Sequence, residues 1–165
     1  MRKTPALVLL LLPAVASWAD DPVVEHQPAL CTVPDKPMSL CATISADRDR
    51  NVAWASIYFK RPEEINFSFV SMAFTGVTYC GTLPGPLEKT KVIEYHISAV
   101  DDAGQSGRTS DFRIEVKPEG ACGFPPLEKD KTKATAIRVI ATDHKQGKKL
   151  DDGFNPTGVT FVPRP

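Results

Sequence analysis

Hydrophobic side chains at every second position are the feature that most limits how this chain can fold. Between Leu40 and Val116 several short runs alternate apolar with polar residues, and none shows the period of a helix. β-Branched and aromatic residues are frequent in these runs, and turn-forming residues separate them at spacings of about 8 to 12 residues. The pattern predicts an all-β fold, an antiparallel β-sandwich without a long helix.

Strands are expected wherever this alternation holds. In the third of them, Phe67, Phe69 and Met72 are grouped on one face across a bulge. The last two runs follow a proline-rich linker, and two such strands are not stable alone in water. We expect them to pair with or cover an exposed edge of the sandwich, which also protects that edge from aggregation. The expected strands are residues 40–45, 53–60, 67–74, 77–83, 92–100, 112–116, 135–141 and 158–162.

The N-terminus has the form of a secretory signal peptide. Arg2 and Lys3 precede an apolar run that reaches Leu12, and small residues stand at the positions that a signal peptidase reads. The apolar run is shorter than the roughly 20 residues that a transmembrane helix needs. We therefore expect cleavage after Ala19, a secreted or periplasmic mature chain, and no membrane span after cleavage.

The remaining residues are enough for one domain. Prolines recur between Pro22 and Pro37, which favours an extended lead-in over a helix or a central strand. The expected organisation is a signal peptide at 1–19, an extended proline-rich lead-in at 20–38, a β-sandwich at 39–117 and, at 118–165, a linker with a two-stranded C-terminal extension packed on the sandwich.

Part of this pattern resembles a known family. The matching segments are Val52–Lys60, Phe69–Met72, Tyr79–Pro84 and Ile93–Gly104. They are similar to the C, C′, E and F strands of bacterial immunoglobulin-like modules related to fibronectin type III. The resemblance covers residues 39–117 and implies an immunoglobulin-like sandwich used for adhesion, spacing or binding. The L-x-P-x-T-x-Y spacing of true fibronectin modules is missing before Tyr95.

Four cysteines bear on how such a sandwich is held together. In an oxidising compartment they are expected to form two disulfides, with free buried thiols as the rival interpretation. Strand phase places Cys41 and Cys80 on the outward faces of strands that are neighbours in the resembled topology. This favours a Cys41–Cys80 bond and leaves Cys31 with Cys122. The alternative connectivity, Cys31–Cys41 with Cys80–Cys122, stays open.

The charges and the histidines give no sign of nucleic-acid binding or catalysis. Without Arg2 and Lys3 the chain carries 18 basic and 20 acidic side chains, so it lacks a basic surface for nucleic acid. His26, His96 and His144 lie in none of the nucleophile or metalloprotease motifs. His96 is interpreted as a solvated residue on a sheet face. We expect a protein that is not an enzyme and has no cofactor.

The turn at 47–51 offers side-chain oxygens at alternate positions, as the start of a calcium loop does. The match stops there, because Val52 stands where an EF-hand loop has glycine and Tyr58 stands where it has glutamate. We therefore expect a solvated turn and no metal site.

One surface is a candidate binding face. If Ala53 and every second residue after it face the core, the aromatic side chains between them face outward. Exposed aromatic groups among polar ones are typical of surfaces that bind proteins or sugars. Two outcomes are open: residues 134–162 cover this face, or the face is free to bind. The candidate residues are Trp54, Tyr58, His96, Glu94 and Arg113.

These observations predict a secreted, non-enzymatic, immunoglobulin-like binding or structural module whose ligand is an unknown protein or glycan. The alternative is a carbohydrate-binding or accessory module that serves a separate enzyme through an exposed Trp/Tyr face. Both functions come from the surface and from the resemblance, since a fold alone does not imply a function.

Overall fold

The computed structural model describes residues 20–122, 136–142 and 150–162. The expected signal peptide and most of the expected linker lie outside these residues. Within them the protein is all-β, and no helix long and apolar enough to cross a membrane occurs there. The strands are β1 (Val23–Glu25), β2 (Cys31–Thr32), β3 (Met38–Ser45), β4 (Val52–Lys60), β5 (Ser68–Ser71), β6 (Ala73–Phe74), β7 (Tyr79–Leu83), β8 (Val92–Asp101), β9 (Ser106–Arg108), β10 (Phe112–Val116), β11 (Ile137–Ala141) and β12 (Val159–Val162).

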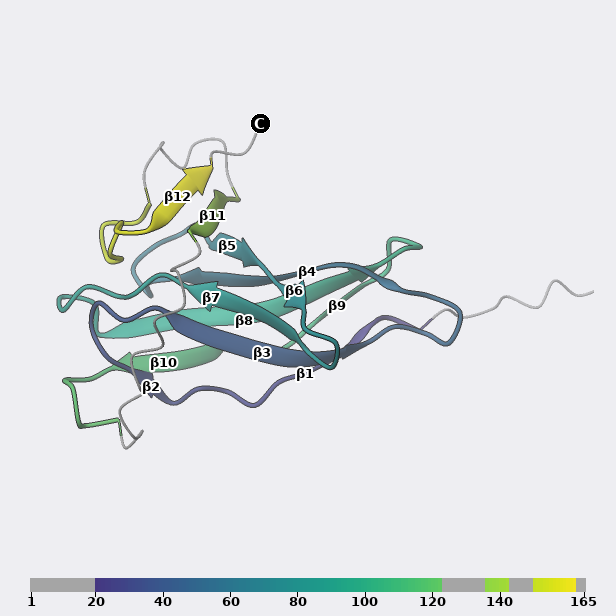
Figure 1. The fold of residues 1–165 in the computed structure, drawn as a ribbon, viewed down its shortest axis with the longest axis horizontal. Helices are drawn as coiled ribbons and strands as arrows, with labels where there is room; N and C mark the ends of the chain where they lie inside the picture. The colour runs from purple at the N-terminus through teal and green to yellow at the C-terminus, as the bar shows by residue number, and fades with distance from the viewer. Residues whose placement is uncertain (1–19, 123–135, 143–149, 163–165) are drawn as a thin grey trace, which may run out of the picture.

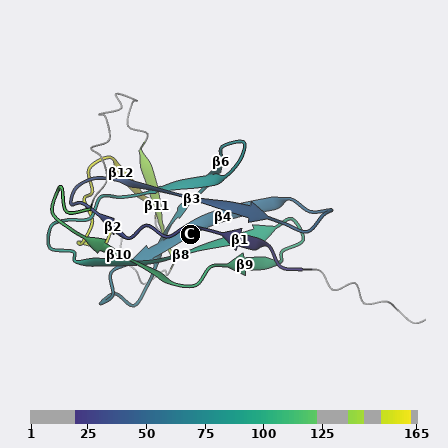
Figure 2. The same cartoon turned by 90° about the horizontal axis from the view of Figure 1, so that it is seen from below.

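The strands form two sheets (Figure 1). The smaller sheet has the order β1-β3-β7-β6, and the larger sheet has the order β12-β11-β5-β4-β8-β10-β2 with β9 paired to β8. In the view from below, β1 of the smaller sheet lies beside β9 of the larger sheet (Figure 2). One hydrophobic core, with residues from both sheets, lies between them.

The larger sheet is mixed, which corrects the expectation of a wholly antiparallel sandwich. β2 pairs with β10 in parallel and β12 pairs with β11 in parallel, whereas the centre β5-β4-β8-β10 is antiparallel. Parallel neighbours cannot be joined by a tight hairpin, and residues 142–158, between β11 and β12, are as long a connection as a crossover needs. The lead-in and the C-terminal extension thus add parallel strands at the two edges of an antiparallel centre.

Alternation in the two central strands builds the core. Ala55, Ile57 and Phe59 of β4 are buried, and Ile97 and Tyr95 of β8 lie opposite the last two of these. Burying an aliphatic or aromatic side chain of this size contributes about 1.5–3 kcal/mol. The central strand pair therefore provides much of the apolar surface on which the smaller sheet packs.

The alternation is interrupted at two places. Ala53 was expected to face the core but is exposed, because the pairing of β4 with β8 shifts register between Val52 and Trp54. The bulge expected in the third strand is a change of sheet: the chain leaves the larger sheet after Ser71 and joins the smaller sheet at Ala73.

Two disulfides are present, Cys31–Cys122 and Cys41–Cys80. Cys41 lies directly opposite Cys80 across β3 and β7. Cys31 of β2 is buried, and its bond joins the lead-in to the segment after β10 across a sequence separation of 91 residues. Closing a loop of that size stabilises a fold by about 4–5 kcal/mol in the chain-entropy account.

The C-terminal extension widens the larger sheet. β11 pairs with β5, and the loop that precedes β12 packs on the end of the sandwich. Phe154 of this loop is buried and meets the Phe59 ring edge-on at a centroid distance of 5.0 Å. Arg61, just after β4, holds the same loop through ion pairs to Asp151 and Asp152 at 2.7 and 2.8 Å.

Candidate functional site

The candidate binding face lies on the outer side of the larger sheet. Tyr58 of β4 pairs with His96 of β8, and Glu94 of β8 pairs with Arg113 of β10. Residues directly opposite on paired strands share a face. Trp54 lies on the same face, because it precedes Tyr58 by an even number of residues within β4. The strand register therefore brings the five candidate residues to one surface.

A row of rings occupies this face. Tyr58 stacks on His96 with ring centroids 5.0 Å apart and an angle of 9° between the planes. Tyr58 also contacts Phe69 at 5.2 Å, and Phe67 meets the His96 ring at 4.9 Å and close to edge-on. We call these four residues the outer aromatic row. Aromatic pairs of this kind contribute about 0.5–1.5 kcal/mol beyond the area that they bury.

Phe67 and Phe69 are members of this row that the hydrophobic pattern did not assign to it. That pattern grouped them with Met72, but Met72 is buried and Phe69 pairs with Tyr58 on the outer side. Grouping them with Met72 relied on a bulge, whereas the unbroken alternation of the buried Val70 and Met72 puts both phenylalanines on the opposite face. That alternation was the signal in the sequence that could have placed them.

His96 is buried, which corrects its interpretation as a solvated residue. Its exposed fraction is 8%, because the Tyr58 and Phe67 rings pack against the imidazole. Nδ1 lies 3.3 Å from Oδ1 of Asp111, yet it has no hydrogen-bond partner in the described part of the chain. Burial and the cationic Arg108 lower the pKa of His96, so the ring is neutral at pH 7.

Charged side chains beside the outer aromatic row neutralise one another. Glu94 accepts a hydrogen bond from Arg113 at 2.6 Å and lies 3.5 Å from Nζ of Lys60. The hydrogen bond from Arg113 lowers the pKa of the Glu94 carboxyl. Arg108 donates to Asp111 at 2.6 Å. The face therefore has no dominant sign of charge, and Glu94 stays ionised, which makes it unsuited to act as a general acid at neutral pH.

Trp54 is the exposed aromatic residue of this face. Its exposed fraction is 46%, and residues 20–165 contain no other tryptophan. The described part of the C-terminal extension does not lie over the face, since β11 continues the larger sheet beside β5. Residues 134, 135 and 143–149 lie outside the described part of the chain, so whether the face is covered or free to bind stays a prediction.

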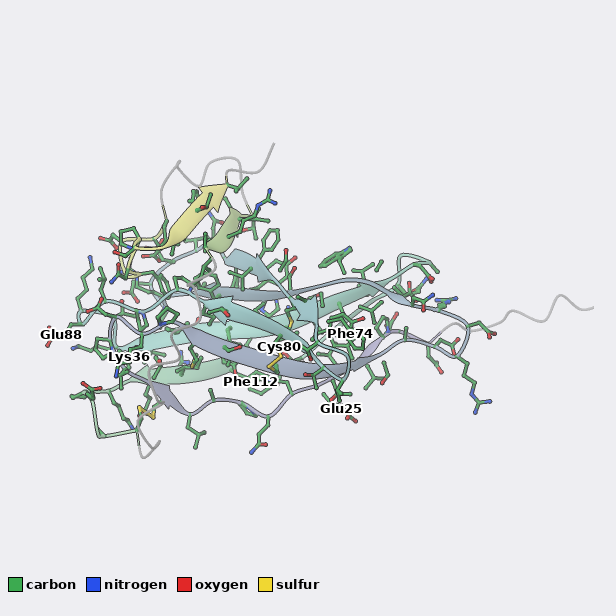
Figure 3. All side chains as sticks on the ribbon, in the orientation of Figure 1. Glu25, Lys36, Phe74, Cys80, Glu88 and Phe112 are labelled. Atoms are coloured by element: carbon green, nitrogen blue, oxygen red, sulfur yellow. A yellow bond between two sulfur atoms is a disulfide. The ribbon has the colours of Figure 1, made fainter. Side chains whose placement is uncertain are left out.

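A second tyrosine–histidine pair lies between the sheets and was not anticipated from the sequence. His26, just after β1, places Nδ1 2.8 Å from the carbonyl oxygen of Cys41 and Nε2 2.8 Å from the hydroxyl of Tyr95. Because a carbonyl oxygen only accepts, Nδ1 donates and Nε2 accepts from Tyr95. Both rings also contact Phe112, which Figure 3 labels. We call His26, Tyr95 and Phe112 the inner node.

The Tyr95 hydroxyl has its partner in the lead-in. It donates a hydrogen bond to Nε2 of His26. Tyr95 is fully buried, and this burial raises its pKa to about 12. The phenol is therefore a neutral structural group that ties the lead-in to β8.

A shallow pocket of about 370 Å³ lies beside the C-terminal extension. Apolar side chains such as Leu87, Phe154 and Phe161 form much of its wall, together with two acidic residues. These two, Asp151 and Asp152, are already paired with Arg61. A ligand site needs a few polar groups that are free to orient the ligand, so the pocket is a weaker candidate than the outer face.

The outer face combines an exposed aromatic ring with charged groups that are already paired. Trp54 offers an exposed ring, and the charged groups beside the outer aromatic row are held in pairs. Among residues 20–122, 136–142 and 150–162, no group of three His, Cys, Asp or Glu residues is placed to hold a metal ion. No protein-family model matches the chain, and no curated protein matches it.

Proposed function

We propose that this protein is a secreted, non-enzymatic binding module of the immunoglobulin-like kind, and that its ligand docks around Trp54 on the outer face of the larger sheet. The observation that carries the proposal is the half-exposed indole of Trp54, on the same face of β4 as the packed outer aromatic row. Tryptophan is among the residues that contribute most to protein–protein binding, because it buries a large area with little loss of side-chain freedom.

Two features support the secreted, immunoglobulin-like part of the proposal. The disulfides Cys31–Cys122 and Cys41–Cys80 suit an oxidising compartment, which is where the expected signal peptide directs the chain. The antiparallel centre β4-β8-β10, packed on β3-β7, is the part that an immunoglobulin-like sandwich shares. The parallel strands β2 and β12 are then additions at its edges.

A partner protein is the favoured ligand, and a glycan is the alternative. The glycan alternative, a carbohydrate-binding or accessory module for a separate enzyme, draws support from Trp54, since a sugar ring can stack on an exposed indole. Tyr58 does not provide a second platform, because its ring already stacks on His96 and contacts Phe69. A single platform among paired charges favours a protein surface over a polysaccharide chain.

Trp54→Ala tests the proposal in the exported protein. Binding is measured on a biosensor against fractionated cell-surface proteins and on a glycan array. The substitution is expected to weaken binding at least about tenfold and to leave the melting temperature unchanged. Val77→Ala is the control, because Val77 is 82% exposed and lies on the turn between β6 and β7, away from this face.

The outcomes separate the two ligand classes. Binding to a protein fraction that Trp54→Ala abolishes supports the proposal, whereas loss confined to the glycan array supports the carbohydrate-binding alternative. Protein binding that survives Trp54→Ala contradicts the assignment of the outer face as the docking surface.

A further inference from the structure

The Cys41–Cys80 disulfide lies on the outer face of the smaller sheet and is more accessible than the other disulfide. Cys41 is exposed and Cys80 is half-buried, whereas Cys31 is only 7% exposed and Cys122 is half-buried. Thiol–disulfide exchange requires an attacking thiolate to reach one of the two sulfur atoms. Cys41 lies on the exposed side of β3, which gives that access.

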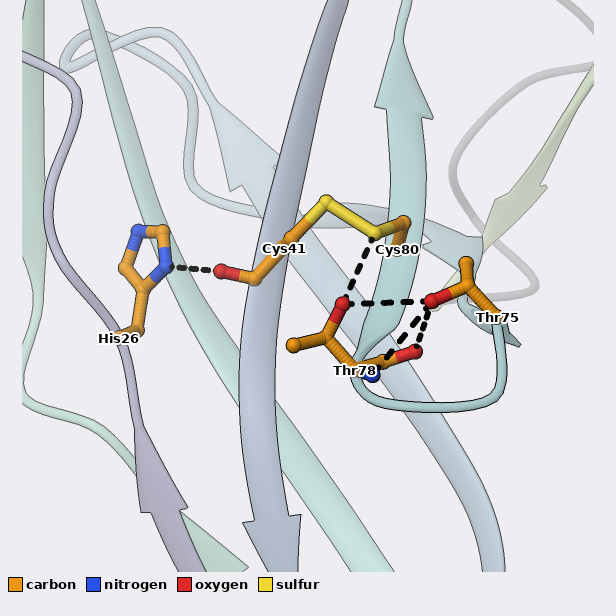
Figure 4. The surroundings of a disulfide bond; sticks show 5 residues. All are labelled: His26, Cys41, Thr75, Thr78 and Cys80. Atoms are coloured by element: carbon orange, nitrogen blue, oxygen red, sulfur yellow. Dashed lines mark hydrogen bonds between the residues drawn. A yellow bond between two sulfur atoms is a disulfide. The ribbon is translucent and has the colours of Figure 1, made fainter.

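A hydroxyl group contacts the other sulfur atom. Oγ1 of Thr78 lies 3.6 Å from Sγ of Cys80 and 3.3 Å from Oγ1 of Thr75. A disulfide sulfur carries no hydrogen, so the Thr78 hydroxyl is the group that can donate to Cys80. Thr75 donates its own hydroxyl hydrogen to the carbonyl oxygen of Thr78 at 2.8 Å, which holds the turn before β7 (Figure 4). A hydrogen bond to a charged acceptor is stronger than one to a neutral acceptor. The Thr78 contact therefore strengthens when Cys80 becomes a thiolate.

We propose that Cys41–Cys80 is a thiol-exchange site for an external dithiol reductant, with Sγ of Cys41 as the attacked atom. One thiolate of the reductant bonds to Cys41, the Cys41–Cys80 bond breaks, and its electron pair leaves on Cys80, whose thiolate accepts the Thr78 hydrogen bond. The second thiol of the reductant loses its proton and attacks the reductant sulfur in the mixed disulfide. Cys41 leaves as a thiolate, the reductant is oxidised to a disulfide, and both cysteines take up protons from water.

The packing makes this reaction selective and leaves the fold in place. The Cys31–Cys122 bond, whose Cys31 side is buried, keeps the lead-in fastened. β3 and β7 stay paired through their backbones from Met38↔Leu83 to Ala42↔Tyr79. The reduced protein thus presents two thiols on the smaller sheet. The site lies on the opposite sheet from Trp54, so the inference is independent of the proposed binding function.

Reduced glutathione is the probe for the first step, because a monothiol stops most readily at the mixed disulfide. Native protein is treated with limiting glutathione, quenched with acid, alkylated and mapped by mass spectrometry of its peptides. The expected map has glutathione on Cys41, the alkyl group on Cys80, and an intact Cys31–Cys122 bond. A map with glutathione mainly on Cys80, or with the Cys31–Cys122 bond opened first, overturns the proposal.

Thr78→Val tests the role of the hydroxyl, with the rate of reduction by dithiothreitol as the readout. Loss of the hydrogen bond to the leaving thiolate is expected to slow reduction at least about fivefold. Thr78→Ser keeps the hydroxyl and retains the native rate, and so does Thr82→Val, which alters the same face of β7 opposite Ser39. Equal rates for Thr78→Val and the native chain contradict the role of Thr78. The glutathione map uses the unaltered chain, so it tests the attacked atom even where Thr78→Val changes folding.

Discussion

Two tyrosine–histidine pairs in this molecule differ in how their polar atoms are used. In the inner node both ring nitrogens of His26 are hydrogen-bonded, one to the backbone of Cys41 and the other to Tyr95. In the outer aromatic row His96 stacks on Tyr58, and its Nδ1 has no hydrogen-bond partner among the described residues. The inner pair joins the lead-in to both sheets, whereas the outer pair lies on one sheet only.

The comparison indicates which of the two pairs contributes more to the stability of the fold. Between the sheets an unpaired polar group costs about 1–3 kcal/mol, so every polar atom of the inner node has a partner. In the outer aromatic row Nδ1 of His96 lies 3.3 Å from Oδ1 of Asp111 without a hydrogen bond among the described residues, so this pair is expected to contribute less to stability than the inner node.

The largest effect is expected from comparing Tyr95→Ala with Tyr58→Ala. Tyr95 is fully buried, and its truncation is expected to lower the free energy of unfolding by about 3–5 kcal/mol. Tyr58 is half-buried, and its truncation is expected to cost about 1–2 kcal/mol. Urea unfolding of both variants measures the difference. Equal losses of unfolding free energy would contradict this comparison, because the outer aromatic row would then contribute as much to stability as the inner node.

Alkaline pH gives the next largest effect and acts on the inner node. Burial raises the pKa of Tyr95 from 10.0 to about 12. A raised folded-state pKa means that the associated stability is fully present below pH 10 and is lost as the pH rises toward 12, by up to about 2–3 kcal/mol. Unfolding measured on both sides of pH 10 is expected to show a weaker pH dependence in Tyr95→Phe than in the native chain. If the free energy of unfolding depended on pH equally in Tyr95→Phe and in the native chain, the burial of a neutral Tyr95 phenol would be contradicted.

Acidic pH gives a smaller effect, which acts on the outer aromatic row. Burial and Arg108 lower the pKa of His96, so the unfolded chain binds a proton before the folded chain does as the pH falls below about 6.5. The stability linked to neutral His96 is therefore present above that pH and declines below it. Melting temperatures between about pH 7 and 5 are expected to fall less in His96→Gln than in the native chain. A steeper fall in the variant would show that His96 gains a partner on protonation.

The smallest effect on stability is expected from Trp54→Ala. Trp54 is half-exposed, so its truncation is expected to change the free energy of unfolding by less than about 0.5 kcal/mol. Thermal unfolding followed by circular dichroism measures this change without relying on the removed fluorophore. A loss as large as that of Tyr95→Ala would mean that Trp54 packs against the protein rather than awaiting a ligand.

Parts of the candidate site could be predicted because they depend on strand phase alone. Tyr58 and His96 were placed on one surface, since alternation within β4 and β8 sends them to the same side once the strands pair. Phe69 was misplaced because it was grouped with Met72, whereas the alternation of the buried Val70 and Met72 puts Phe69 on the opposite face. The burial of His96 was also missed, because it depends on rings from other parts of the chain.

The inner node could not be predicted from any local pattern. His26 and Tyr95 lie far apart in the sequence, and nothing near either residue indicates the other. Their contact exists because the lead-in crosses between β3 and β8. Long-range contacts of this kind are decided by how the elements pack, and hydrophobic periodicity carries no information about them.

The sequence by itself determined that the described chain is all-β, where its main strands lie and that its cysteines form two disulfides. These are consequences of local periodicity and of residue chemistry, which act within a few neighbouring positions. The tertiary structure alone decided the parallel edges β2 and β12, the outward turn of Ala53, and the different environments of His26 and His96. Each of these depends on which distant segment supplies the hydrogen bonds and covers the side chain, and that choice is made only when the whole sandwich packs.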